Sequence, residues 1–207
     1  MVRFTGSAFA ELGWPLIATL ALLSGCASTP PSRFYVLTPR VEAKAKVEAE
    51  EPGVFLLVGP VEVAAYLDRP QIVTRSGENE VELAEFDRWA QSLKESLPKL
   101  LGSSLSALLG RERVFGANEP ALGEPRFRVG LSVSRFDGAI GGDVVLEARW
   151  LLLGGPDARD PQLLSIRTSR IVKPAGSDGY RSLVAGMSEA VADLCREIAA
   201  AVMETSS

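Results

Sequence analysis

Three segments in the second half of the chain alternate apolar residues with polar or small ones, and this period of two constrains the fold more than any other sequence feature. They cover residues 127–133, 144–152 and 164–172. Successive side chains of a strand point to opposite faces, so each segment would bury one face only. One-sided burial is typical of antiparallel sheets, and the glycine-rich sequences between the segments are typical of turns. The pattern therefore predicts three antiparallel strands.

The apolar positions of these segments define the face that is expected to be buried. In the last segment, Leu164, Ile166 and Val172 share one phase with Arg170. A charged side chain needs water or a partner, so we expect Arg170 near an edge or opening of the sheet. Trp150 lies in the apolar phase of the second segment and is expected to anchor the core.

Two other segments show the helical period. Ser92 and Glu95 form a capping-box pattern, and leucines at helical spacing follow them. Pro98 lies inside this pattern and predicts either a kink or a later start of the helix. A second amphipathic helix is expected over residues 180–203. Cys195 lies on its apolar face and is interpreted as a small buried hydrophobe, with a reactive thiol or an intermolecular disulfide as the alternatives.

Shorter strands are expected in the first half of the chain. Their ranges are 34–37, 54–58 with a continuation at 61–63 beyond a bend at Gly59-Pro60, and a hairpin of 71–75 and 81–83. The charged residues 40–53 are expected to form a solvated helix or a loose insertion, without an assigned function. Together the segments predict the fold class α+β: a single domain with a mainly antiparallel β-sheet and two amphipathic helices packed on one face.

The N-terminal residues have the organisation of a targeting segment. The apolar run at residues 16–23 would span about 12 Å as a helix, far less than the ~30 Å hydrocarbon core, and fits a secretory signal. The sequence LSGC at residues 23–26 resembles the bacterial lipobox, whose cysteine is acylated. We therefore expect residues 1–25 to be a lipoprotein signal peptide, 26–33 to be the lipidated Cys26 with its tether, and 34–207 to be the folded domain. The alternative is an N-terminal core helix with an incidental cysteine.

The residue types exclude several kinds of chemistry. The chain has no histidine, which removes Ser-His-Asp and Cys-His nucleophiles and every histidine-containing zinc site. Its net charge of −4 argues against nucleic acid as a partner. We find no phosphate-binding glycine motif and no spaced pair of carboxylates, and Trp89 is interpreted as a core anchor rather than a stacking platform. The sequence indicates a binding or scaffolding protein that is not an enzyme and needs no cofactor or metal ion.

Residues 58–109 carry a resemblance to a known family. They read VGPVEVAAYLDRPQIVTR at the start and FDRWAQSLKESLPKLLGSSLSALL at the end, and the most specific pieces are YLDRPQIV and RWA. Together with the lipobox, they resemble the ABC-type transport auxiliary lipoproteins, the paraquat-inducible protein C-like family of membrane integrity-associated transporter subunits. The resemblance covers essentially the whole mature chain.

The resemblance implies an outer-membrane lipoprotein that faces the periplasm of a Gram-negative bacterium. Ala27 is compatible with this sorting, since Asp is associated with inner-membrane retention. Such proteins accompany an ABC transporter or permease and a mammalian-cell-entry (MCE) domain protein that forms a periplasmic tunnel. The implied role is to dock or receive that tunnel while phospholipid, or another hydrophobic compound, moves between membranes. No catalytic residues come with the family.

The segment Tyr66, Leu67, Asp68, Arg69 and Pro70 is the candidate interface. Asp68 and Arg69 cannot both enter a dry core without partners, and Tyr66 and Arg69 are residue types that dominate interface energies. We therefore expect a homo-oligomer, assembled as a ring through part of residues 66–75. The alternative is an ordinary loop between strands.

Two rival functions remain open at this stage. One is a monomeric periplasmic lipoprotein that binds a small hydrophobic ligand in a cavity between the sheet and the helices. The other is a purely structural envelope lipoprotein without a link to a transporter. Neighbouring genes for an ATPase, a permease and an MCE-domain protein would favour the transport role.

Overall fold

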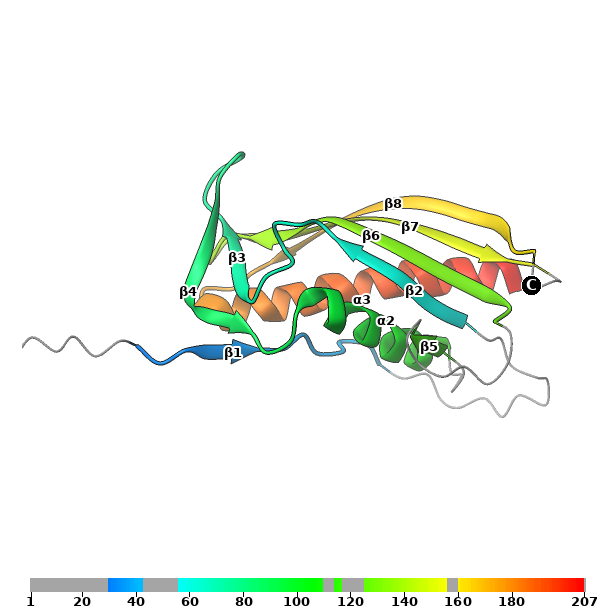
Figure 1. The fold of residues 1–207 in the computed structure, drawn as a ribbon, viewed down its shortest axis with the longest axis horizontal. Helices are drawn as coiled ribbons and strands as arrows, with labels where there is room; N and C mark the ends of the chain where they lie inside the picture. The colour runs from blue at the N-terminus through cyan, green and yellow to red at the C-terminus, as the bar shows by residue number, and fades with distance from the viewer. Residues whose placement is uncertain (1–29, 43–55, 110–113, 117–124, 156–159, 207) are drawn as a thin grey trace, which may run out of the picture. The chain divides into compact units, whose positions relative to one another are not determined.

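The computed structural model describes residues 30–42, 56–109, 114–116, 125–155 and 160–206. The expected signal peptide, Cys26 and most of the charged stretch 40–53 lie outside these residues. The elements, labelled as in Figure 1, are β1 (Arg33–Tyr35), β2 (Leu56–Val63), β3 (Gln71–Arg75), β4 (Val81–Trp89), α2 (Leu93–Leu109), β5 (Val114–Gly116), β6 (Phe127–Gly138), β7 (Asp143–Gly154), β8 (Gln162–Pro174) and α3 (Gly179–Ser206). The α+β fold class predicted from the sequence is confirmed.

The larger sheet has five strands in the order β5-β2-β6-β7-β8. The three alternating segments form its β6, β7 and β8, which pair antiparallel as predicted. β2 runs parallel to both β5 and β6, so the sheet is mixed. Parallel neighbours require a long crossover, and the chain between β2 and β6 passes through the small sheet and α2. Side-chain alternation reports burial and not strand direction, so the sequence did not reveal these parallel pairs.

The predicted phase of β8 is wrong. Leu164, Ile166 and Val172 have exposed fractions of 38%, 48% and 42%, whereas Ser169 and Ile171 face the core. β8 is an edge strand. A polar residue can face the core from this strand because α3 supplies a hydrogen-bond partner. The Ser169 hydroxyl, for example, is hydrogen-bonded to the Glu197 carboxylate.

Two other expectations for these strands are confirmed. Arg170 lies on the edge strand β8 and pairs with Glu147 of β7 at 3.1 Å between Nε and Oε1. Trp150 is 1% exposed and its indole N–H donates to Ser169 at 3.0 Å. A buried indole N–H needs such an acceptor.

The smaller sheet has three strands in the order β1-β4-β3. β3 and β4 form the predicted hairpin, and β1 adds parallel to β4 with Arg33 opposite Asp87. In β2, the predicted bend appears as a shift of register between Val58 and Val61. Gly59 has a φ of 130° there, a conformation that side chains with a Cβ rarely adopt.

Both predicted helices are present. α2 begins at Leu93, and the Glu95 amide donates to the Ser92 hydroxyl at 3.3 Å, as the capping box predicts. Pro98 lies inside the helix, so a later start does not occur. On α3, Cys195 is fully buried, and this burial raises the pKa of its thiol to about 12. A protonated, inaccessible thiol is inert, which confirms its interpretation as a small hydrophobe.

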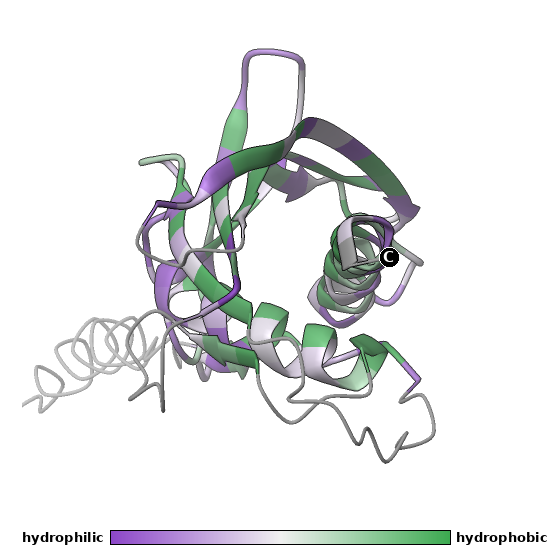
Figure 2. Cartoon of the chain, turned by 90° about the vertical axis from the view of Figure 1, so that its right-hand side faces the viewer, coloured by the Kyte–Doolittle hydropathy of each residue, from purple (hydrophilic) through white to green (hydrophobic). Residues whose placement is uncertain are grey.

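The core lies between the larger sheet and the two helices. Figure 2 shows α3 inside the curve of the strands, with α2 beside it. α3 contacts β6, β7 and β8, while α2 contacts β2, β5 and α3. Leu101 of α2 and Trp150 of β7 are each 1% exposed and belong to one hydrophobic cluster, as expected. Within the described residues, we find no helix with the length and apolar character needed to cross a membrane.

Candidate functional site

The five residues of the predicted interface form the loop between β2 and β3. The Leu67 amide donates to the Ala64 carbonyl at 2.9 Å, which closes a turn. Leu67 is 1% exposed, Tyr66 and Arg69 are half-buried, and Asp68 and Pro70 are exposed. The segment is therefore a loop in which some side chains belong to the core and others reach solvent.

The Tyr66 hydroxyl is held by a buried carboxylate. It donates to Asp137 Oδ2 at 2.8 Å, and the Asp137 side chain, near the end of β6, is 0% exposed. Arg75 of β3 binds the same carboxylate through Nε at 2.9 Å and Nη2 at 2.8 Å. Arg135 adds an Nε contact at 3.0 Å. Asp137 thus joins the loop and the hairpin of the smaller sheet to the larger sheet.

The protonation states of this cluster suit a structural role. Burial by itself raises the pKa of Asp137, but the hydrogen bonds from Arg75, Tyr66 and Arg135 outweigh it and leave the pKa below its ordinary value. Burial and the bond to Asp137 raise the pKa of Tyr66 to about 12. Asp137 is therefore ionised, Tyr66 is protonated, and the cluster holds no group that exchanges protons near neutral pH.

The far end of the loop is attached to the end of β4. The Pro70 carbonyl accepts a hydrogen bond from the Trp89 amide at 2.7 Å, and the Tyr35 carbonyl accepts one from the Ala90 amide at 2.9 Å. The loop and β1 therefore bind consecutive residues of the chain. Within the described part of the chain, the buried Nε of Arg69 has no hydrogen-bond partner.

Sequence reasoning did not identify Asp137 as part of a site. It lies 62 residues from Arg75 and 71 from Tyr66, so no local spacing marks the cluster. The sequence predicted only that Asp137 and Gly138 belong to a turn between two strands, and it did not place Tyr66, Arg75 or Arg135 beside them.

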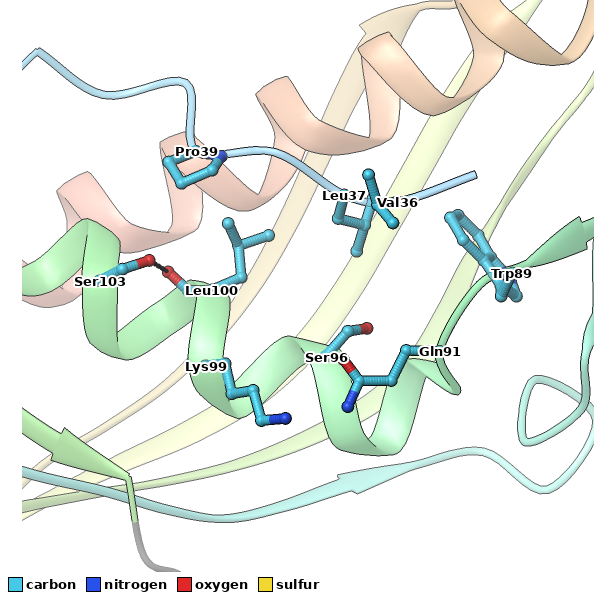
Figure 3. Close-up of a pocket in the computed structure, with 9 residues that line it drawn as sticks. All are labelled: Val36, Leu37, Pro39, Trp89, Gln91, Ser96, Lys99, Leu100 and Ser103. Carbon is cyan, nitrogen blue, oxygen red and sulfur yellow. Dashed lines mark hydrogen bonds between the residues drawn. The ribbon is translucent and has the colours of Figure 1, made fainter. Parts of the chain in front are cut away.

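A shallow pocket of about 340 Å³ lies between α2 and the chain that follows β1. Figure 3 shows its mainly apolar lining, formed by Val36, Leu37, Pro39, Trp89 and Leu100, with Gln91, Ser96, Lys99 and Ser103 as the polar residues. The volume is at the lower end of the range for small-molecule sites. The Ser103 hydroxyl donates to the Leu100 carbonyl at 3.0 Å. Lys99 is the charged residue of the lining.

A second hollow, of about 510 Å³, lies on the outer face of the larger sheet. Gly130 is part of its lining, and a Cβ at this position would lie in van der Waals contact with the Leu151 side chain, at 3.4 Å. Leu153 and Ile166 add apolar surface, and Arg128 and Arg149 contribute charge. No group of three or more potential metal ligands occurs among the residues that the structure describes.

These features define the class of protein as an α+β domain with a loop hydrogen-bonded to a buried carboxylate and with shallow apolar surfaces, suited to contacts with partners. Two solved structures share the fold. Protein XCC0632 from Xanthomonas campestris has a TM-score of 0.66 and 19% identity, and an uncharacterized protein has a TM-score of 0.66 and 23% identity. Each match covers 84% of this chain and 99% of the other.

Residues 35–199 match the model of the ABC-type transport auxiliary lipoprotein component, and the chain belongs to this family. The intermembrane transport lipoprotein PqiC of Escherichia coli (strain K12) is 28% identical over 189 residues, which cover 89% of this chain and 96% of PqiC. The resemblance found in the sequence is confirmed. Both descriptions are of transport components, which suggests a non-catalytic role.

We predict that Asp137→Ala lowers the free energy of unfolding by about 3–5 kcal/mol at pH 7, since it leaves Arg75 and Arg135 without their buried anion. The folded-state pKa of Asp137 lies below its ordinary value, so the stabilisation is complete above about pH 4 and is lost as the pH falls through the folded-state pKa. The difference between wild type and variant should therefore shrink in acid. Urea denaturation from pH 3 to 7 measures it.

Glu147→Ala is the matched control, because it removes a carboxylate that is 34% exposed and paired with Arg170 in the same sheet. Its cost should stay within about 1 kcal/mol at pH 7. Equal costs for the two variants at pH 7 would contradict the structural role of Asp137.

Proposed function

We propose that the chain is an outer-membrane-anchored periplasmic lipoprotein and a non-catalytic auxiliary subunit of an ABC/MCE-type intermembrane lipid transport system. In this role it docks or receives the periplasmic tunnel formed by the MCE-domain protein. The observation that carries the proposal is the family match over residues 35–199, preceded by a lipobox. The similarity to an intermembrane transport lipoprotein supports it.

The proposed anchor is Cys26, seven positions before the start of β1. Seven extended residues span at most about 25 Å, so an acylated Cys26 would keep β1 close to the membrane surface. One acyl chain binds a bilayer only marginally, whereas each further chain adds ~0.8 kcal/mol per buried CH₂. A diacylglyceryl cysteine would therefore be a lasting anchor, and Ala27 is compatible with the outer membrane.

The proposed contact with other subunits is made by the loop at residues 66–70. Since Leu67 is buried and the Tyr66 hydroxyl is bound to Asp137, the side chains that can reach a partner are those of Asp68, Arg69 and Pro70. Asp137 would hold these side chains in one arrangement, which lowers the entropy cost of binding. Anchors in one membrane plane raise the effective concentration of copies and favour a closed ring around the tunnel axis.

A second function, the binding of a small hydrophobic ligand by a monomer, is favoured by the two shallow apolar hollows of about 340 and 510 Å³. Lys99 lines the first hollow, and Arg128, Arg149 and Glu62 line the second. Cationic side chains outnumber the one carboxylate, so such a ligand would be apolar with an anionic group. In this case the protein would remain monomeric in the presence of the MCE protein.

We predict that Cys26→Ala abolishes palmitate labelling and leaves the precursor uncleaved, because the variant lacks the thiol that is acylated. Metabolic labelling with radioactive palmitate and gel mobility measure the two effects. Cys195→Ala is the control and should label normally, since Cys195 is fully buried in the core. Undiminished labelling of the Cys26 variant would refute the anchor.

We also predict that the wild-type lipoprotein self-associates in mild detergent and binds the cognate MCE-domain protein. Asp68→Ala and Arg69→Ala should weaken this assembly at least severalfold, since residues of interface type lose their contacts. Light scattering coupled to size-exclusion chromatography gives the mass of each complex.

Arg170→Ala, which removes an arginine that is 61% exposed on the edge of the other sheet, serves as the control and should assemble normally. Tyr66→Ala is unsuitable as an interface probe, because it also removes a hydrogen bond to Asp137. A strictly monomeric wild type that ignores the MCE protein would overturn the ring and favour ligand binding by a monomer.

A further inference from the structure

The strand that follows the tether exposes its apolar side chains to solvent. Phe34 is 65% exposed and Val36 is 58% exposed, the two highest values among the large hydrophobic side chains of the described residues. Phe34 lies in β1, at the edge of the smaller sheet, and Val36 directly follows this strand (Figure 1). Large apolar side chains exposed side by side indicate a surface that is covered by something else.

The pairing of β1 explains why Phe34 points away from the protein. Arg33 and Tyr35, on either side of it, both bind Asp87, at 3.0 Å and 2.7 Å respectively. Since neighbouring residues of a strand face opposite sides, Phe34 must face outward. This orientation is imposed by two polar contacts, so Phe34 has no alternative position in the core.

The outward face around Phe34 combines aromatic and cationic groups. Arg88 lies directly opposite Phe34 in the register of β1 and β4, and Phe86 precedes it by two residues on the same face. Phe86 and Arg88 are half-buried, so each leaves part of its side chain exposed on the same face as Phe34. Proteins often meet the headgroup region of a bilayer with this combination. The aromatic rings enter the apolar part, and the guanidinium group of the arginine stays at the polar surface.

The length of the tether indicates which surface covers this face. Phe34 is eight positions after Cys26. Eight extended residues span at most about 29 Å, so an acylated Cys26 would keep this face within that distance of the bilayer and raise its effective concentration there.

We propose that Phe34 and Phe86 insert into the lipid surface of the anchoring membrane, while Arg88 meets the phosphates. The inference rests on the anchor at Cys26 that belongs to the proposed function. A single lipid anchor leaves the domain free to rotate, whereas this second contact fixes its orientation. Because Pro70 and Tyr35 bind the consecutive amides of Trp89 and Ala90, the loop at residues 66–70 would then be held at one height above the membrane.

The experiment uses the lipidated full-length product with Phe34→Trp, reconstituted into vesicles of ordinary phospholipid or of lipid brominated along its acyl chains. Trp89 and Trp150 are 5% and 1% exposed, so wild-type fluorescence gives a background that can be subtracted. We expect the added emission to shift to the blue in vesicles and to be lost with brominated lipid. Leu163→Trp, at a position 57% exposed on β8, is the matched control and should show neither effect.

Flotation of the vesicles tests the anchor separately. Protein that fails to float contradicts the anchor and with it this contact. Protein that floats while the new tryptophan emits as in water overturns the membrane contact alone. A blue shift without quenching by brominated lipid would also overturn it, since that result identifies a second copy of the chain, and not lipid, as the group covering Phe34.

Discussion

The structure depends on the burial of one carboxylate. An ionised group in a protein interior is tolerated only when its hydrogen-bonding capacity is met, and Asp137 meets this condition with two arginines and a tyrosine. These partners come from the loop after β2, from β3 and from β6 itself. The ion cluster therefore adds a polar connection between the two sheets to the hydrophobic cluster that they share. Removal of the anion would leave two partly buried arginines without their partner and would remove the ionic contact that holds the hairpin.

The connected segments are those proposed to meet membrane and partners. The loop at residues 66–70 and β1 are both hydrogen-bonded to the end of β4. Tyr35 of β1 also contacts the Tyr180 ring at the start of α3, with 6.5 Å between ring centroids. A partner would therefore meet side chains whose backbone is already ordered, and little conformational entropy remains to be lost on binding. The core between α2, α3 and the larger sheet supplies the rigid support for this arrangement.

The sequence predicted the elements governed by local pattern and missed those that depend on distant partners. The capping box at Ser92, the hairpin of β3 and β4 and the strands β6 and β7 each follow from a short-range period or turn. The face of β8 predicted to be buried was wrong. Ser169 faces the core, where an apolar residue would be expected, because its hydroxyl is hydrogen-bonded to Glu197 of α3. Asp137 was missed because 62 residues separate it from Arg75. Cys26 remains a prediction from the sequence, since it lies outside the described residues.

Native-state amide hydrogen exchange of the mature lipoprotein and its Asp137→Asn variant tests most directly whether Asp137 connects the two sheets. If it does, the amides of β3 and β4 lose protection in the variant while those of β7 keep it, because local opening follows the contacts that are removed. Unchanged protection of the hairpin would contradict this account. An equal loss of protection across both sheets would contradict it as well, since it would mean that Asp137 stabilises the domain as a whole without connecting its parts.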